Sequence, residues 1–398
     1  MPSNAMLASV GWSAHEDAFT AGDTAAKSAI QNLETRRASC AIVFASSWYD
    51  QIQLLAGLHA ALGATPIVGG STAGEITPEG PKSQSCVVVI LPEEGLPMSI
   101  GVGTGLDHDA RMAGYQAAQQ ALRQLPGGQR SGMLFFGDGL LSGCYAEALR
   151  GIQEVLGTSS LVTGGLMADD MRLANTFQYA NGRAHQQAIV ALLFGGSCRI
   201  GVGIEHGFSP ISKPRRITKA HGNVLEQLDG QPASSVYEEY FGAAAMEATA
   251  GVGLTRWLIA YPLGIQQESN RQFLLRNVMA FGQSGSLLCS GDVTEGSWVQ
   301  LMIGSKELAL EAASFAAQQA VRSLRSTRFV LVFDSAVRRR LLGRDATAEI
   351  MRIRLAVGSS VPVAGCYTYG EQAPRGGLSL YGQSSLQTGA CLVIAVGS

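Results

Sequence analysis

The sequence is poor in charged residues and lacks several patterns that would restrict its function at once. Only 15% of the 398 residues are charged, and the net charge is −2. A charge this low and this balanced argues against broad electrostatic binding to nucleic acid or to a membrane surface. No run reaches the roughly 18 unbroken apolar residues that a spanning helix needs, so no membrane insertion is expected.

Cysteine motifs and a secretory signal are also missing. The seven cysteines are scattered and odd in number, and no C-x-x-C pair occurs. This argues against a structural zinc site, and we assign no metal ligands. The N-terminus has no basic stretch followed by an apolar segment. Both observations favour a reducing, cytoplasmic location.

Two distant segments, by contrast, are conspicuously alike. Ile67–Glu75 reads Ile-Val-Gly-Gly-Ser-Thr-Ala-Gly-Glu, and Val363–Glu371 reads Val-Ala-Gly-Cys-Tyr-Thr-Tyr-Gly-Glu. Each is a strand-like apolar run that opens into glycines, small or hydroxyl side chains and a glutamate. A weaker third copy lies between these two segments, at Gly164-Gly165. The repetition indicates that the glycines are partly scaffold, whereas the polar residues around them are candidates for a site.

The similarity extends to a strand, helix, strand unit with a further terminal strand, found three times. Helices are expected over 51–62, 107–125, 143–156, 305–324 and 345–356, with Asp109 and Ser305 as N-caps. Because strand–helix–strand order favours parallel pairing, the pattern predicts an α/β fold. We expect duplicated αβ modules with mixed, partly parallel sheets flanked by helices.

The least regular region separates two expected domains. We predict an N-terminal segment over residues 1–24, a first domain over 25–206, a helical junction over 207–253 and a second domain over 254–398. Helical stretches are expected near Lys219–Leu228 and Ser234–Phe241. Two short basic clusters, Lys213–Arg216 and Arg338–Arg340, are interpreted as solvated surface.

The two loops supply the candidate ligand-binding residues. The first contributes Ser71, Thr72 and Glu75, and the richer second one contributes Tyr367, Thr368, Tyr369 and Glu371. Two aromatic rings beside a carboxylate can enclose a small cationic or amphipathic ligand. Arg276 interrupts an apolar strand, and a buried arginine needs a carboxylate from the protein or from a ligand. Asp138 and Asp334 follow apolar strands, and Asp169-Asp170 follows the middle Gly-Gly loop; carboxylates there can bind a ligand amine, coordinate a cation or cap the next helix.

Two other functions remain open from the residues. Gly69–Gly74 comes within one residue of the G-x-S-x-G nucleophile elbow, so a serine hydrolase using Ser71 is one alternative to a protein that is not an enzyme. His206 and His221 are interpreted as structural or exposed, yet either could ligate a non-covalent haem. No cofactor is otherwise expected.

Five motifs in order give the sequence a family resemblance. Gly69–Ile76, Tyr261–Ile265, Leu275–Asn277, Glu295-Gly296 and Gly365–Glu371 together resemble the FIST (F-box and intracellular signal transduction) proteins, over roughly residues 25–398. The resemblance implies a FIST N-like domain before the junction and a FIST C-like domain after it. It also implies a cytoplasmic sensor of signal transduction that binds an amino acid or similar metabolite. The chain leaves no space for an output domain, so a separate partner such as a histidine kinase is expected. Some relatives resemble haem proteins that sense nitric oxide, which keeps that alternative open.

Overall fold

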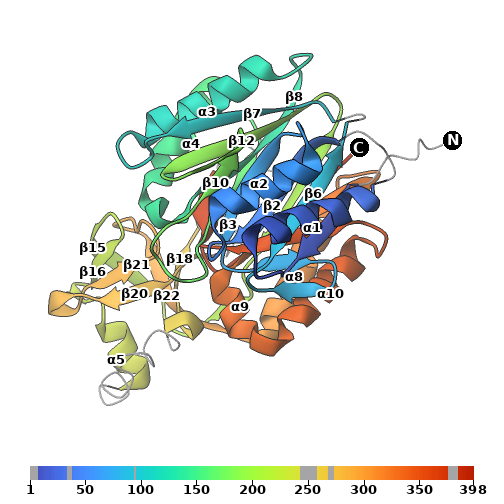
Figure 1. The fold of residues 1–398 in the computed structure, drawn as a ribbon. Helices are drawn as coiled ribbons and strands as arrows, with labels where there is room; N and C mark the ends of the chain where they lie inside the picture. Colours follow the sequence, from blue (N-terminus) through green and yellow to red (C-terminus); the bar gives the residue numbers. More distant parts are fainter. Residues whose placement is uncertain (1–7, 34–37, 94–95, 243–257, 268–272, 375–383) are drawn as a thin grey trace.

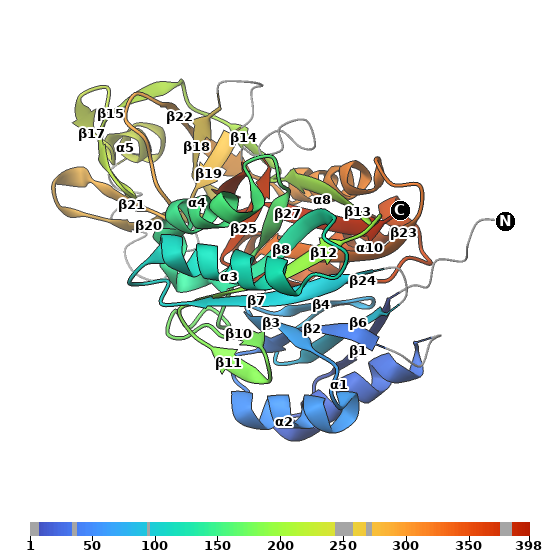
Figure 2. The ribbon, with the colours of Figure 1, turned by 90° about the horizontal axis from the view of Figure 1, so that it is seen from above.

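The computed structural model describes residues 8–33, 38–93, 96–242, 258–267, 273–374 and 384–398. Three six-stranded sheets and one nine-stranded sheet lie in these residues (Figure 1). The three six-stranded sheets contain parallel and antiparallel pairs and carry helices on their outer faces (Figure 2). The predicted α/β fold with mixed, partly parallel sheets is therefore confirmed.

Each six-stranded sheet is built on one module of the same order. In every module an outer strand leads to a helix, a central strand, a second helix, a parallel strand and a returning antiparallel strand. The first module contains β1 (Ser9–Ser13), α1 (Ala18–Gln31), β2 (Ala38–Ser46), α2 (Gln51–Leu62), β3 (Ile67–Thr72) and β6 (Cys86–Pro92). The second contains β7 (Met98–Thr104), α3 (Ala110–Gln124), β8 (Arg130–Asp138), the 3-10 turn η1 (Gly139–Cys144), α4 (Tyr145–Leu156), β9 (Val162–Met167) and β12 (Ala188–Gly195). The third contains β13 (Arg199–Glu205), α8 (Lys306–Val321), β23 (Thr327–Ser335), α9 (Ala336–Leu342), α10 (Ala346–Val357), β24 (Val363–Thr368) and β27 (Cys391–Gly397).

The modules exchange hairpins in a cycle. The first module's β4 (Glu75–Thr77) and β5 (Gly80–Lys82) extend the third sheet by pairing with β24. The second module's β10 (Gln178–Ala180) and β11 (Arg183–His185) extend the first sheet by pairing with β3. The third module's β25 (Gly370–Pro374) and β26 (Ser384–Gln387) extend the second sheet by pairing with β9. The three modules therefore form one interlocked body with pseudo-threefold order.

The inner faces of the sheets meet in a shared apolar core. Phe44, Phe136 and Phe333 hold matching positions on the three central strands, and their ring centroids lie 5.7–6.1 Å apart. All three rings are fully buried. Because each module alone would expose its inner face, their association buries the large apolar fraction that the composition provides.

Sequence periodicity located five of the outer helices, but α1, which crosses the predicted boundary at residue 24, was not predicted. The structure confirms the five expected helices as α2, α3, α4, α8 and α10. Asp109 and Ser305 are N-caps, since their side chains accept hydrogen bonds from the Met112 and Leu308 N–H groups. No helix among the described residues is long and apolar enough to cross a membrane.

The third module carries an insertion between β13 and α8. It contains α5 (Ser235–Phe241) and nine strands, namely β14 (Phe208–Pro210), β15 (Arg215–His221), β16 (Val224–Leu228), β17 (Gln231–Pro232), β18 (Leu263–Gln266), β19 (Phe273–Arg276), β20 (Val278–Phe281), β21 (Leu287–Cys289) and β22 (Trp298–Gly304). It projects from the side of the three modules (Figure 1).

The structure of the insertion differs from the predicted helical junction. The prediction of a helix near Lys219–Leu228 is wrong, because β15 and β16 form an antiparallel hairpin there. Gly222-Asn223 makes its turn, and Asp229-Gly230 makes the turn into β17, with positive φ at Gly222, Asp229 and Gly230. Such dipeptides favour hairpin turns, a signal that outweighs helical periodicity. The helix expected over Ser234–Phe241 is confirmed as α5, while residues 243–253 lie outside the described residues.

Candidate functional site at the junction of three loops

The Gly-rich loops of the three modules meet and bind one another. Their backbone N–H groups donate around a cycle: Ala73 to Tyr367, Ala168 to Ser71, and Tyr369 to Leu166, at 2.9, 2.9 and 3.0 Å. The donors hold matching positions in the three loops, and so do the acceptors. We number the loops by module: the first is Ile67–Glu75, the second contains Gly164-Gly165, and the third is Val363–Glu371. The first and third loops, which were singled out from the sequence, are thus joined to each other and to the second.

Two of the predicted residues are carboxyls in matching surroundings. The Thr72 hydroxyl donates to Glu75 at 2.5 Å, and the Thr368 hydroxyl donates to Glu371 at 2.8 Å. The other oxygen of each glutamate accepts from the residue before the returning strand, from Ser85 in one case and from the Ala390 N–H in the other. Both threonine–glutamate pairs are fully buried, so the hydrogen bonds of these side chains are made to other protein groups.

Burial raises the pKa of Glu75 to about 7 and that of Glu371 to about 8, although the hydrogen bonds they accept oppose the shift. Both folded-state pKa values exceed the unfolded value of about 4.5. Between pH 5 and 8 the folded protein therefore retains protons that the unfolded chain releases. We expect the free energy of unfolding to fall as pH rises through this window, by about 1.4 kcal/mol per pH unit for each carboxyl held protonated.

This expectation is measured by urea unfolding at pH 5, 6, 7 and 8. The double variant Glu75→Gln/Glu371→Gln should show a flatter dependence than the unmodified protein. Glu79→Gln is the control variant, because Glu79 is exposed and pairs with Lys82. Its stability should depend on pH with the same slope as that of the unmodified protein. An unchanged slope in the double variant would contradict the assignment of these two carboxyls.

Ser71 is held by backbone groups of the second module. Its hydroxyl donates to the Ala168 carbonyl at 2.6 Å and accepts from the Phe177 N–H at 2.8 Å. The side chain is fully buried. Its visible role is therefore to dock the first loop on the second.

Tyr369 lies closest to solvent among the predicted loop residues. Its ring is half-buried, and its hydroxyl donates to Asp169 at 2.5 Å. Asp169 also accepts from the N–H groups of Leu173, Ala174 and Asn175, so it fixes the turn that follows the second loop. Tyr369 therefore connects the third module to a turn in the second.

That turn is strained and bears exposed side chains. Asp170, Met171 and Leu173 have φ values of 54°, 64° and 55°. This left-handed region is unfavourable for residues other than glycine, and such strain gathers at functional sites. Asp170 accepts from Ser46 and Ser47, while the Arg172 guanidinium lies 4.7 Å from the centroid of a Trp48 ring. Trp48 is 58% exposed and Leu173 is 56% exposed.

Two predicted residues face other surroundings. Tyr367 points to the helix side of its sheet, packs in the cluster with Ile350 and Ile353, and has the Arg339 guanidinium 4.8 Å from its ring centroid. Arg276 is buried, and its guanidinium donates to the carbonyls of Asp292 and Leu275 at 2.8 and 2.9 Å. The structure thus places Tyr367 and Tyr369 in different environments.

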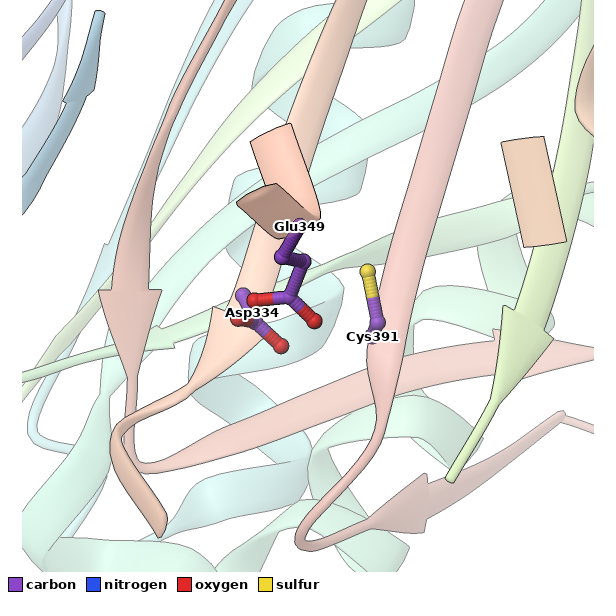
Figure 3. A group of neighbouring side chains, drawn as sticks. All are labelled: Asp334, Glu349 and Cys391. Atoms are coloured by element: carbon purple, nitrogen blue, oxygen red, sulfur yellow. The ribbon is translucent and has the colours of Figure 1, made fainter. Parts of the chain in front are cut away.

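Beneath Tyr367 lies a buried charged cluster that follows from sheet register. Asp334 is in register with Tyr367 on one side and with Cys391 on the other, so the three share a face. Asp334, Glu349 and Cys391 offer atoms within 4.8 Å of one another (Figure 3). The Arg338 guanidinium donates to Asp334 at 2.8 Å and also to Glu349. The cationic partner of these carboxyls is therefore arginine.

Among the residues that the structure describes, the second oxygens of Asp334 and Glu349 and the Tyr367 hydroxyl have no hydrogen-bond partner. Burial and the nearby Glu349 raise the pKa of Asp334 well above its usual range. Burial alone would lower the pKa of Arg338, but Glu349 and Asp334 raise it. A proton retained on Asp334 lowers the repulsion between the two carboxyls beside the charged arginine.

The basic cluster that contains this arginine was interpreted wrongly from the sequence. Arg338 is fully buried, and Arg339 is half-buried, whereas Arg340 is exposed. Arg339 donates to the Ala73 and Lys82 carbonyls, which ties α9 to the first loop. The missed signal is an aspartate at the end of an apolar strand followed four residues later by an arginine, because Asp334 lies at the end of β23 and Arg338 lies in the first turn of α9.

The two histidines differ in environment. Burial lowers the pKa of His206 to about 4, so its ring is neutral near pH 7. Its Nδ1 accepts from the Phe208 N–H at 2.9 Å, and the ring has a further hydrogen bond with the Phe273 backbone. His221 is exposed at the end of β15.

Comparison with known proteins gives a matching family, a curated relative over part of the chain, and distant solved structures that include two cyanuric acid hydrolases. Residues 39–231 match the FIST N domain, and residues 233–374 match the FIST C domain. An uncharacterized protein of Methanocaldococcus jannaschii, MJ1623, is 26% identical over 164 residues, which is 38% of this chain. The chain spans 31% of that relative's length. A cyanuric acid hydrolase from A. caulinodans and a second cyanuric acid hydrolase align with 98% of the chain and 99% of their own, at 11% and 12% identity and a TM-score of 0.35. Similarity at this level implies neither a shared fold nor a shared reaction.

Proposed function

Because the chain belongs to the FIST family, with its N and C domains in tandem, we propose that it is a small-ligand sensor acting on a separate output partner such as a histidine kinase. FIST domains are associated with signal transduction and small-ligand sensing. The ligand in this proposal is an amino acid or a similar metabolite, bound without being transformed. The Ser71 hydroxyl is buried and makes two hydrogen bonds to backbone groups, which supports binding of a ligand over its hydrolysis.

The cycle of hydrogen bonds between the three loops is the observation that carries this proposal. The first two loops belong to the FIST N match, and the third belongs to the FIST C match. A ligand that contacts one loop therefore acts on both domains. Such a ligand changes signalling only if it binds two arrangements of the loops with different affinity.

The accessible rim of the junction offers suitable contacts. Tyr369 and Trp48 supply aromatic surface, Arg172 supplies a cation for a carboxylate, and Asp170 supplies an anion for an amine. The turn that carries Arg172 has left-handed backbone at its neighbours, so the rim includes a strained segment of the kind that gathers at functional sites. These groups complement both charges of an amino acid.

We expect Tyr369→Phe to weaken ligand binding about tenfold. Phenylalanine lacks the hydroxyl that donates to the Asp169 carboxylate, and without this hydrogen bond the aromatic ring is less well aligned at the rim. The measurement is a thermal-shift screen of amino acids and related metabolites, followed by titration of each compound that raises Tm. Tyr115→Phe is the control, since Tyr115 is also half-buried and hydrogen-bonded, through Gln119, but lies on α3. Equal affinity in both variants would place the ligand elsewhere.

The same preparation tests the alternative functions. Native mass spectrometry and an absorption spectrum of freshly purified protein report any bound metabolite or haem. A Soret band that shifts with nitric oxide would replace the metabolite proposal with a haem sensor. Labelling of Ser71 by a fluorophosphonate probe would replace it with a hydrolase. For the output, autophosphorylation of a co-purified histidine kinase should change when protein and ligand are added together.

A further inference from the structure

A recess lies at the start of β8, away from the loop junction. It has a volume of about 490 Å³, which is within the usual range for small-molecule sites. Its apolar lining includes Leu156, Leu161 and Ile200. Residues of the second module and of the third module share this lining, whereas the loop junction lies at the opposite, carboxyl end of β8. The recess is thus a feature of the seam between two modules and does not depend on the proposed function.

The polar lining of the recess is cationic. Arg130 and Arg199 both line it, and none of the lining residues among the described part of the chain is acidic. Arg130 donates to the Leu156 carbonyl at 3.2 Å, a contact that orients the guanidinium without neutralising it. Two arginines beside one recess attract an anion, and each can bind a phosphate or carboxylate through two N–H groups.

Serine side chains add neutral donors to the same lining. Ser131, Ser159, Ser160 and Ser323 line the recess. Ser131 and Ser160 donate their hydroxyl protons to the carbonyls of Gly196 and Leu156, so they do not supply donors to a ligand. Ser159 and Ser323 are exposed at the edge of the recess. The hydroxyls of these two serines, next to guanidinium groups, suit a site for an oxyanion.

The repeated fold does not require an arginine at the start of β8. Arg130 pairs with Gly195 next to an irregularity of register. In the other two sheets the same position is held by Ala38, which pairs with Pro92, and by Thr327, which pairs with Gly397. Since alanine and threonine suffice for the fold there, the charge of Arg130 is specific to this seam.

We propose that this recess binds a small organic anion through a phosphate or carboxylate group held by Arg130 and Arg199. Isothermal titration calorimetry with AMP and with succinate distinguishes the two anion types, and inorganic phosphate tests the bare group. We expect Arg130→Gln/Arg199→Gln to weaken binding of the recognised probe at least tenfold. Affinity for that probe should also fall as salt rises.

The control for this experiment is Arg183→Gln on β11. Arg183 is exposed, as Arg130 and Arg199 are, but it lies outside the recess. It should leave the affinity unchanged, and so should Tyr369→Phe at the loop junction. The far-ultraviolet circular dichroism of all variants should match, because both lining arginines are exposed. Failure of all three probes to bind, or equal weakening by Arg183→Gln, would overturn the proposal.

Discussion

Replacing Arg338 with methionine is expected to lower the free energy of unfolding by about 3–5 kcal/mol, because it leaves buried carboxyls without their cation. Arg338 is fully buried and donates to Asp334, Glu349 and the His206 and Ala309 carbonyls. Methionine retains much of the apolar volume of the side chain, so the loss reports mainly on charge and hydrogen bonds. The measurement is chemical denaturation followed by circular dichroism.

Arg340→Met provides the matched control. Arg340 lies on the same helix two residues later but is exposed, so its replacement should change stability by less than about 0.5 kcal/mol. Adding Asp334→Asn and Glu349→Gln to Arg338→Met should restore part of the loss, since the orphaned charges are then removed. Equal stabilities for Arg338→Met and Arg340→Met would refute the role of Arg338 as the buried cationic partner of Asp334 and Glu349.

The elements of the fold could be predicted because strong local patterns coincide with the tertiary contacts. The helices α3 and α8 each follow a capping residue and repeat alanines on their buried faces. The β15–β16 hairpin was missed because its polar, half-exposed residues carry weak periodicity, while the decisive information lies in Gly222-Asn223. The cyclic exchange of hairpins was out of reach, since it depends on pairing between segments as distant as β4 and β24.

The candidate site was located only in part. The two loops do meet, and the paired contacts of Thr72 with Glu75 and of Thr368 with Glu371 explain why both sequences carry threonine three residues before glutamate. Their burial could not be read from the sequence, because polar residues in glycine-rich loops are usually exposed. The role of Arg338 was hidden for the same reason, since a run of three arginines normally faces solvent.

Alanine at Gly164 is expected to cost about 2–5 kcal/mol of stability, because it combines backbone strain with a steric overlap. Gly164 has a φ of 155°, and a Cβ there would overlap the Phe135 carbonyl oxygen on the neighbouring strand. Gly69 and Gly365 hold the matching positions, where a Cβ would overlap the carbonyl oxygens of Val43 and Val332. The three glycines therefore permit the same close approach of parallel strands in every module.

The control for the glycine series is Gly143→Ala. A Cβ at Gly143 meets no atom within 4 Å, and its φ is not in the left-handed region, so that variant should fold with nearly unchanged stability. Thermal and urea unfolding of Gly69→Ala, Gly164→Ala and Gly365→Ala should each show a loss, whichever ligand the protein binds; at Gly365 the loss comes from the steric overlap alone, because its φ is not in the left-handed region. A neutral effect at Gly365, with large losses at the other two, would mean that the third module tolerates a different strand geometry. The glycines of the FIST N and FIST C loops would then no longer have one shared structural cause.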